Sequence, residues 1–264
     1  MFKTILTEVD ADVGIITLNR PERHNAFDDI LIHELIGAVA AMEADDAVRV
    51  LVISSTGKSF SAGADLNWMR RAAAYSVDES MTDARALAEM LRTLAQMNKP
   101  TLARVQGSAF GGGVGLVAAC DIAIATFDAQ FSFPEVKLGI IPSVISPHVI
   151  SAIGERHTRR YMLTAERFAA AEAYRIGLVH EIVADEEALD AAIGEIVLAL
   201  LKNGPKAIGE CKALIQTVAK KPITEALIED TARRIASIRA GDEAKEGMSA
   251  FLEKRAPSWT LKNH

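Results

Sequence analysis

The chain has 264 residues, of which 50% are hydrophobic, 24% charged and 5% aromatic. This length is sufficient for one large hydrophobic core, or for a core with a helical appendage. The longest apolar runs are far shorter than a membrane span, and the formal net charge of −6 comes without any run of lysines or arginines. The composition therefore disfavours a membrane protein and a protein that binds nucleic acid through a broad basic face.

The N-terminus and the two cysteines predict a cytoplasmic protein. Residues 1–14 contain acidic residues where a signal peptide needs an apolar segment and a cleavage site. Cys120 and Cys211 lie in apolar sequence without metal-ligand spacing, which predicts two buried thiols in a reducing compartment. We therefore expect no bound metal ion.

The first part of the chain predicts alternating strands and helices. Apolar alternation or runs of branched residues indicate strands at residues 2–9, 13–18, 49–54 and 100–105. Pro21 ends the second strand, and Asn25 is expected to open a helix whose apolar positions continue to Met42. Residues 78–97 predict a second, amphipathic helix.

The second part predicts short strands followed by helices alone. Strands are expected at residues 121–125, 130–133 and 178–183, and helices at 147–153, 164–176 and 185–202. Helical sequence then continues to about Lys254, with breaks at Lys221-Pro222 and near Gly241. This distribution predicts an α/β core domain at residues 1–200, which carries the active site, and a helical C-terminal region at residues 201–264.

Two corners share one order of strand, small residues and helix, at residues 61–64 and 111–113. Small residues at a helix start leave unpaired backbone N–H groups around an open position. A phosphate loop needs a Gly-Lys-Ser/Thr triplet, which is absent, and Leu116 stands where a dinucleotide motif needs its last glycine. Each corner alone fits a tight turn without a ligand, whereas one N–H from each could form an oxyanion hole.

Glu135 is the carboxylate with the most unusual sequence neighbourhood, FSFPEVKLGII at residues 131–141. One interpretation is a strand-end glutamate with its carboxylate in water. The other is a carboxyl group held among apolar side chains, with a raised pKa suited to proton transfer. The residues alone leave both open. No HExxH zinc pair and no GxSxG serine-hydrolase motif occur.

Five motifs in order decide between these interpretations: SAGADL (61–66), GGG (111–113), CDIAIA (120–125), PEVKLGIIP (134–142) and LTAERFAAAEAYRIGLV (163–179). This arrangement resembles the enoyl-CoA hydratase/isomerase family, the crotonases, over essentially the whole chain. The resemblance implies an α/β, crotonase-like spiral of repeated ββα units. It also implies that the C-terminal helical region mediates trimers, which commonly pair into hexamers.

The resemblance assigns roles to particular residues. The backbone N–H groups of Ala64 and Gly112 would hold the thioester oxygen, and Glu135 matches the family's second catalytic glutamate. The first corner would line the bound acyl-CoA through Ala62, Asp65, Leu66 and Asn67. Coenzyme A is part of the substrate, so no separate cofactor is expected.

The phosphates of coenzyme A need cations in a chain that is itself negative. Arg20, Arg23 and Lys58 are candidates, and Lys254 and Arg255 could reach the coenzyme A of a neighbouring subunit. Each could equally be a solvated surface residue. We expect a homotrimer or a dimer of trimers, because the helical tail is too apolar for a free appendage.

One position departs from the two-glutamate hydratases of the family. Their first catalytic glutamate lies three residues after the second glycine of the corner, where this chain has Gly115. We expect room beside Glu135 at this point but no second carboxylate. Main-chain groups, Ser143, Ser146 or a carboxylate of the substrate would then position the water.

Three functions follow from these observations. Segments such as FSAGADLNWM and LGIIPSVISPHVI resemble bacterial methylglutaconyl-CoA hydratases, which favours hydration of a branched, carboxylated enoyl-CoA in leucine or isoprenoid breakdown. An enoyl-CoA double-bond isomerase with a single glutamate is the alternative enzyme. A non-catalytic crotonase-fold protein that binds RNA or protein is the third. The acidic pI of about 5.6 argues against RNA, and the presence of Glu135 with both corners argues against loss of activity.

Overall fold

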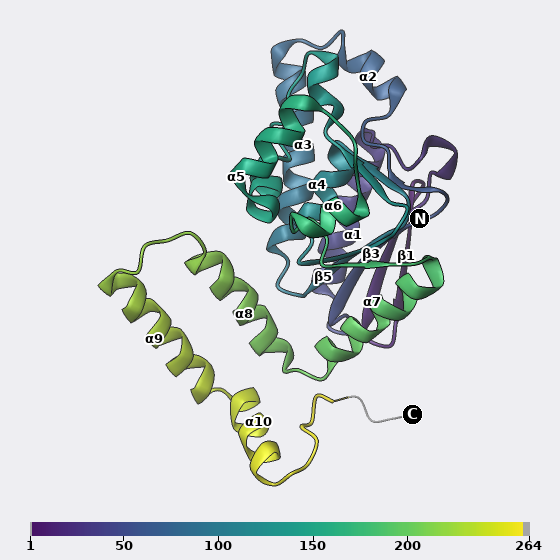
Figure 1. Ribbon diagram of the computed structural model, residues 1–264. Coiled ribbons are helices and arrows are strands. Elements are labelled where there is room, and N and C mark those ends of the chain that lie inside the picture. Colours follow the sequence, from purple (N-terminus) through teal and green to yellow (C-terminus); the bar gives the residue numbers. More distant parts are fainter. Residues whose placement is uncertain (1, 261–264) are drawn as a thin grey trace.

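The computed structural model describes residues 2–260, which form two β-sheets enclosed by helices (Figure 1). The last part of the predicted C-terminal region, residues 261–264, lies outside the described residues. The larger sheet has the order β1-β2-β3-β5-β7-β10. Its strands are β1 (Ile5–Asp10), β2 (Val13–Leu18), β3 (Val50–Ser55), β5 (Thr101–Val105), β7 (Ile122–Thr126) and β10 (Glu181–Val183). Apart from the β1–β2 hairpin, neighbouring strands are parallel.

The smaller sheet has the order β4-β6-β8-β9. Its strands are β4 (Ser59–Ser61), β6 (Ser108–Phe110), β8 (Gln130–Ser132) and β9 (Phe168–Ala169). Three consecutive strand pairs, β3/β4, β5/β6 and β7/β8, each place their first strand in the larger sheet and their second in the smaller one. Helices follow each pair. This repetition is the predicted spiral of ββα units.

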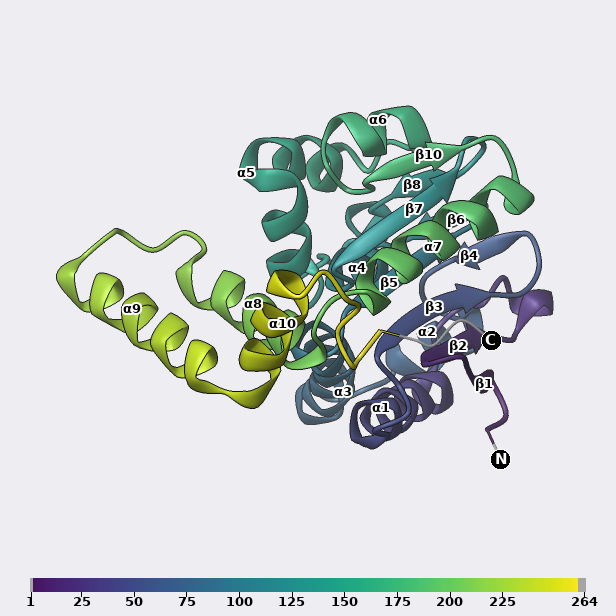
Figure 2. The ribbon, with the colours of Figure 1, turned by 90° about the horizontal axis from the view of Figure 1, so that it is seen from below.

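The strands of the larger sheet are buried on both faces, as parallel strands require. In β3, Leu51 and Ile53 pack into the main core, whereas Val50 and Val52 face α7 (Glu186–Leu201) through Leu189 and Ile193. Figure 2 shows α7 lying across the outer face of this sheet. The main core also contains helices α1 (Asp29–Ala44), α3 (Val77–Gln96), α4 (Gly112–Ala119) and α5 (Ser146–Thr164).

The C-terminal helices α8 (Pro205–Val218), α9 (Glu225–Ala240) and α10 (Asp242–Leu252) extend away from this core (Figures 1 and 2). Neither α8 nor α9, both described in full, contains a buried residue. The prediction of a buried thiol at Cys211 is therefore wrong for the single chain, because α8 leaves it exposed. No helix among residues 2–260 is long and apolar enough to cross a membrane.

Two sequence predictions about helices are wrong. Asn25 does not open a helix: α1 begins at Asp29, and the Asp28 side chain caps it by accepting a hydrogen bond from the amide of Leu31. Asn25 instead adopts a positive φ of 52° and donates from its amide group to the carbonyl oxygen atoms of Thr56 and Ser59.

The predicted helix at residues 164–176 is interrupted as well. Helix α5 continues to Thr164, strand β9 follows, and only α6 (Ala170–Arg175) is helical. Phe168 pairs with Phe131 of β8, and it packs against the Tyr161 ring at 4.2 Å between centroids. These tertiary contacts outweigh the helical preference of the alanine-rich sequence.

Candidate active site

Three neighbouring strands of the smaller sheet end at one edge. Strands β4, β6 and β8 run parallel, with Ser61 paired to Ala109 and Phe110 to Ser132. Because parallel strands direct their carboxyl ends to the same edge, the three segments that follow them meet there. These segments carry Ala64, Gly112 and Glu135. The sheet thus brings together the three predicted catalytic positions, which are far apart in sequence.

The two small-residue corners touch each other. Gly63 has a φ of +87°, and a Cβ atom at this position would lie 2.9 Å from the carbonyl oxygen of Phe110 and 3.9 Å from the Cα of Gly111. Only glycine allows both this backbone conformation and this approach. The main chain around Ala64 is therefore held directly against the start of α4.

Both predicted oxyanion donors are free to face the cavity. Phe27 donates from its amide to Gly63 and accepts from the amide of Asp65, at 2.6 and 2.8 Å, so the intervening amide of Ala64 points to the opposite side. Gly112 is the first residue of α4, where amides have no partner within the helix. Neither amide has an acceptor among residues 2–260. Such a pair at a helix start can stabilise a developing oxyanion.

Glu135 lies in the short 3₁₀ helix η2 (Pro134–Leu138), directly after β8. Its Oε2 atom is buried and accepts no hydrogen bond from any described residue. Burial raises the pKa of this carboxyl group above its ordinary value, and the weaker opposing effect is a hydrogen bond with its own backbone. A carboxyl group of raised pKa with one unpartnered oxygen is suited to proton transfer, which favours the second of the two interpretations of Glu135.

These groups line a cavity of about 410 Å³. Its walls are mostly apolar and come from Phe27, Ala62, Gly63, Ala64, Leu66, Trp68, Met69, Leu87, Gly111, Gly112, Pro134, Glu135, Leu138, Ile140, Ile141, Pro142, Ser143, Val144 and Ile145. Among these lining residues Glu135 is the one with an ionisable side chain. Leu66 and Ile141 stand at the exposed mouth, 66% and 71% exposed. The cavity can therefore hold an apolar chain next to a single carboxyl group.

The expected room at Gly115 does not exist. A Cβ atom at this position would lie 2.4 Å from Cγ2 and 2.9 Å from Cβ of Ile145. Ile145, which precedes α5, occupies the space where a longer side chain at position 115 would project. The prediction that Gly115 leaves this room is wrong, because a residue 30 positions further along the chain folds back over the glycine.

The predicted acyl-CoA contacts divide into two groups. Ala62 and Leu66 line the cavity, whereas Asp65 and Asn67 do not. Asp65 is 4% exposed, and its carboxylate accepts hydrogen bonds from the amides of Asn67 and Trp68, which caps helix α2 (Leu66–Ala72). Asn67 is exposed and accepts a hydrogen bond from Arg70. Direct contacts of Asp65 and Asn67 with the substrate stay predictions.

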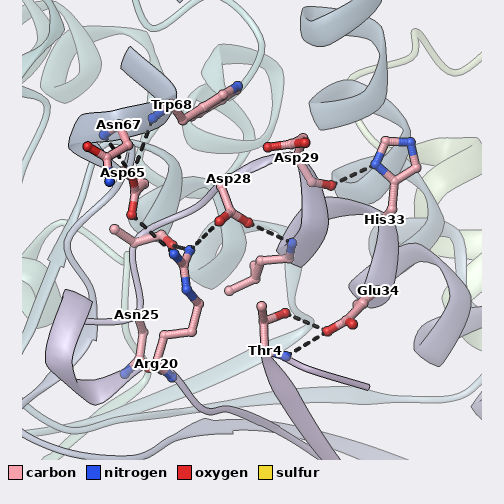
Figure 3. Close-up of polar contacts among 12 residues, drawn as sticks. Thr4, Arg20, Asn25, Asp28, Asp29, His33, Glu34, Asp65, Asn67 and Trp68 are labelled. Atoms are coloured by element: carbon pink, nitrogen blue, oxygen red, sulfur yellow. Dashed lines mark hydrogen bonds and ion pairs between the residues drawn. The ribbon is translucent and has the colours of Figure 1, made fainter. Parts of the chain in front are cut away.

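Both terminal nitrogens of the Arg20 guanidinium have partners inside the protein. This guanidinium lies 2.9 Å from the carboxylate of Asp28 and 3.1 Å from that of Asp65 (Figure 3). It also donates to the carbonyl oxygen of Ala26. Burial alone would raise the pKa of Asp65, but the amides of Asn67 and Trp68 and the charges of Arg20 and Arg23 lower it below its ordinary value. Arg20 thus joins the capping residues of α1 and α2, and these contacts do not leave it free for a phosphate.

We expect Arg20→Met to lower the free energy of unfolding by about 3–5 kcal/mol, because it leaves two largely buried carboxylates without their counter-ion. Chemical denaturation measures this loss. Arg159→Met is the control, since Arg159 and Glu155 form an ion pair in which both side chains are 70% exposed. Its loss should be about 0–1 kcal/mol. Equal losses in the two variants would contradict the structural role of Arg20.

The remaining cationic candidates lie at the surface. Arg23, Lys58 and Lys254 are exposed. Arg255 donates twice to the Glu246 carboxylate, at 2.7 and 2.8 Å, so it is already paired. Lys254 follows α10, which lies at the opposite end of the molecule from α2 in Figure 1. Its predicted contact with coenzyme A therefore depends on a neighbouring subunit, and stays a prediction like that of Arg23.

The two serines predicted to position water lie differently, and three further residues of the site have no recognisable signature in the sequence. Ser143 lines the cavity, whereas the hydroxyl of Ser146 donates to the Ser143 carbonyl oxygen at 2.7 Å. Trp68 is 8% exposed and donates from Nε1 to Asp83, which fixes α2 against α3. Phe27, Trp68 and Ile145 line the cavity without any prediction from the sequence, because tertiary contacts bring them there. Within residues 2–260 no cluster of side chains is suited to hold a metal ion.

Comparison with known proteins identifies the class of this site. The family model for enoyl-CoA hydratase/isomerase matches residues 8–262. The crotonyl-CoA hydratase of Syntrophomonas wolfei is 35% identical over 99% of both chains, and the 2,3-dehydroadipyl-CoA hydratase of Escherichia coli is 30% identical over 94% of both. A crystal structure of an enoyl-CoA hydratase from Shewanella pealeana is 41% identical, with a TM-score of 0.95 over 98% of this chain and 96% of that chain.

The chain belongs to the enoyl-CoA hydratase/isomerase family. The family and the crotonase-like fold predicted from the five motifs are thereby confirmed. The protein is an enzyme of a family that acts on acyl-CoA thioesters. The roles of individual residues stay predictions, which the geometry of the cavity now makes testable.

Proposed function

We propose that the protein adds water across the double bond of an enoyl-CoA whose acyl chain is branched and carries a distal carboxylate, as in methylglutaconyl-CoA. In this proposal the amides of Ala64 and Gly112 polarise the thioester oxygen, and Glu135 transfers a proton at the α-carbon. The E. coli relative supports a carboxylated substrate, because its name specifies an adipyl-derived acyl group. Such an activity would belong to leucine or isoprenoid breakdown.

The single carboxyl group of the cavity carries this proposal. Hydration needs one group that delivers a proton to the α-carbon and another that removes a proton from water. Glu135 can serve only one of these roles at a time, and Ile145 fills the space over Gly115. The second group must therefore come from another source, and a carboxylate of the substrate is one that the reaction itself supplies.

The protons balance without a further reactant. Glu135 gives its proton to the α-carbon while the water oxygen bonds to the β-carbon, and the substrate carboxylate accepts the proton that the water loses. The proton then returns to Glu135 through water. The raised pKa of Glu135 favours the protonated form that this step needs, and the Ser143 segment of the lining can hold the water.

Isotope labelling tests the proposal. In water enriched in ¹⁸O, the product from methylglutaconyl-CoA should carry one labelled hydroxyl oxygen, detected by mass spectrometry. Turnover of methylglutaconyl-CoA should exceed that of crotonyl-CoA, which lacks the second carboxylate. Equal turnover of the two thioesters would contradict the role given to the substrate carboxylate.

An enoyl-CoA double-bond isomerase is the second candidate, and the same single carboxyl group favours it. Moving a double bond requires one group that takes a proton from one carbon and returns it to another, with no second base for water.

The pH dependence separates the two candidates. In an isomerase Glu135 would act from its ionised form, so the rate should fall as the pH drops below its raised pKa. In the hydration scheme the rate should fall as the pH rises above it. Migration of the double bond without incorporation of ¹⁸O would identify the isomerase.

We also propose that the chain forms a homotrimer, or two trimers paired. Several large apolar side chains of the C-terminal helices are exposed in the single chain, among them Ile235 at 54% and Phe251 at 83%. A second subunit could cover them. Light scattering at micromolar concentration should therefore give at least three times the chain mass. A stable monomer would contradict this proposal.

A further inference from the structure

Two side chains from the segment after β8 cover two glycines at the start of α4, its N-cap residue Gly111 and Gly115 within the helix. The Glu135 carboxyl lies against Gly111, where a Cβ atom would be 2.9 Å from Oε1. Ile145 lies against Gly115 in the same way, at 2.4 Å. The amide of Gly115 donates to the carbonyl oxygen of Gly111, which places the two glycines one helical turn apart. Glu135 and Ile145 therefore approach α4 at positions about one helical turn apart, and both line the same cavity.

Ile145 is both fixed and in contact with the cavity. It is 3% exposed, belongs to the main core, and directly precedes α5. It also lines the cavity that contains Glu135. The absence of a side chain at Gly115 is what allows Ile145 to pack this close to α4. Its position follows from the packing of α4 against α5, so it cannot move aside for a ligand without disturbing the core.

We infer that Ile145 is the specificity-determining residue of this cavity, which limits the size of the substituents on the β-carbon of the acyl chain. The inference rests on the proposed function in one respect, namely that the cavity binds the acyl chain. In this arrangement the amides of Ala64 and Gly112 bind the thioester oxygen, and the α-carbon lies at Glu135. The acyl chain then continues along α4, so that its β-carbon and the substituents on that carbon meet the Ile145 side chain.

The test uses Ile145→Ala, which removes three carbon atoms from the cavity wall. A series of enoyl-CoA thioesters with methyl, ethyl and propyl groups on the β-carbon measures the effect. A difference of one or a few methylene groups in an apolar pocket changes kcat/KM by about 10- to 200-fold. We expect the ratio of kcat/KM for the propyl over the methyl substrate to rise by this factor in Ile145→Ala, and Ile145→Val to give a smaller rise.

Ile153→Ala is the matched control. Ile153 is also 3% exposed and part of the same core, but it does not line the cavity. Both alanine variants lose buried contacts, so both should show a lower Tm. Only Ile145→Ala should change the substrate ratio. An unchanged ratio in Ile145→Ala, or an equal change in Ile153→Ala, would overturn the inference.

A double-mutant cycle tests the contact itself. Gly115→Ala should destabilise the parent because its methyl group collides with Cγ2 of Ile145. In the Ile145→Ala background that atom is absent, so the same substitution should cost less. Additive effects on stability would show that Gly115 and Ile145 do not act together, and would also overturn the inference. If the parent enzyme turns over neither methylglutaconyl-CoA nor any thioester of the series, the proposed function fails first, whereas activity on the series with an unaltered ratio rejects only the role of Ile145.

Discussion

Replacing Glu135 with glutamine is expected to lower turnover by about 10²–10⁴-fold, the usual contribution of a positioned acid or base. Glutamine preserves the shape of the side chain but cannot exchange the proton at the α-carbon. The rate is measured from the absorbance of the conjugated thioester. Glu195→Gln serves as the control for loss of a negative charge, because Glu195 is exposed on α7 and away from the cavity lining. Near-normal turnover of Glu135→Gln would show that Glu135 is not the proton-transfer residue.

The same variant should differ from the parent in the pH dependence of its stability. Burial raises the pKa of Glu135 in the folded chain, so the contribution of this group to the free energy of unfolding is complete below its unfolded pKa. It is lost as the pH rises through the folded pKa, because folding then buries a charge. Glutamine has no charge to bury. Glu135→Gln should therefore be more stable than the parent at neutral pH, and this advantage should disappear near about pH 4.

Removing the amide of Gly112 is expected to lower turnover by about 10²–10³-fold, as for loss of one oxyanion donor. Gly112→Pro achieves this at the first position of α4, where proline is compatible with a helix. Any side chain here approaches Phe27, since a Cβ atom would lie 2.9 Å from Cδ2 of the ring. Gly112→Ala adds the same Cβ atom but keeps the N–H group, so the ratio of the two rates isolates the donor.

Circular dichroism must show that both variants fold, because Gly111, directly before the substitution, has a φ of 50° and a ψ of −117°. Proline restricts the residue that precedes it, and this backbone conformation is one that it could disturb. If both variants are folded and equally active, the amide of Gly112 does not contribute to catalysis. A deficit confined to Gly112→Pro supports its predicted role.

Local sequence was sufficient for the features that depend on neighbouring residues. The strand, glycine corner and helix at residues 101–119 follow from branched residues, three glycines and a run of small apolar residues. The capped helix after Asp185 and the breaks around Pro222 and Gly241 were predicted for the same reason, and the structure confirms them. Five ordered motifs were then enough to predict the family.

Contacts between distant residues decided the rest of the site. Nothing near Glu135 in the sequence distinguishes an exposed carboxylate from a buried one, and its burial depends on the cavity walls that other segments build around it. Arg20 was a phosphate candidate until the fold placed two carboxylates beside it.

At Gly115 the sequence and the tertiary structure lead to different conclusions. The sequence indicated free space there, because a missing side chain leaves a gap unless another residue fills it. Protein interiors are close-packed, so a neighbour does fill it. Ile145 is that neighbour, and the packing of α4 against α5 alone determined its place there.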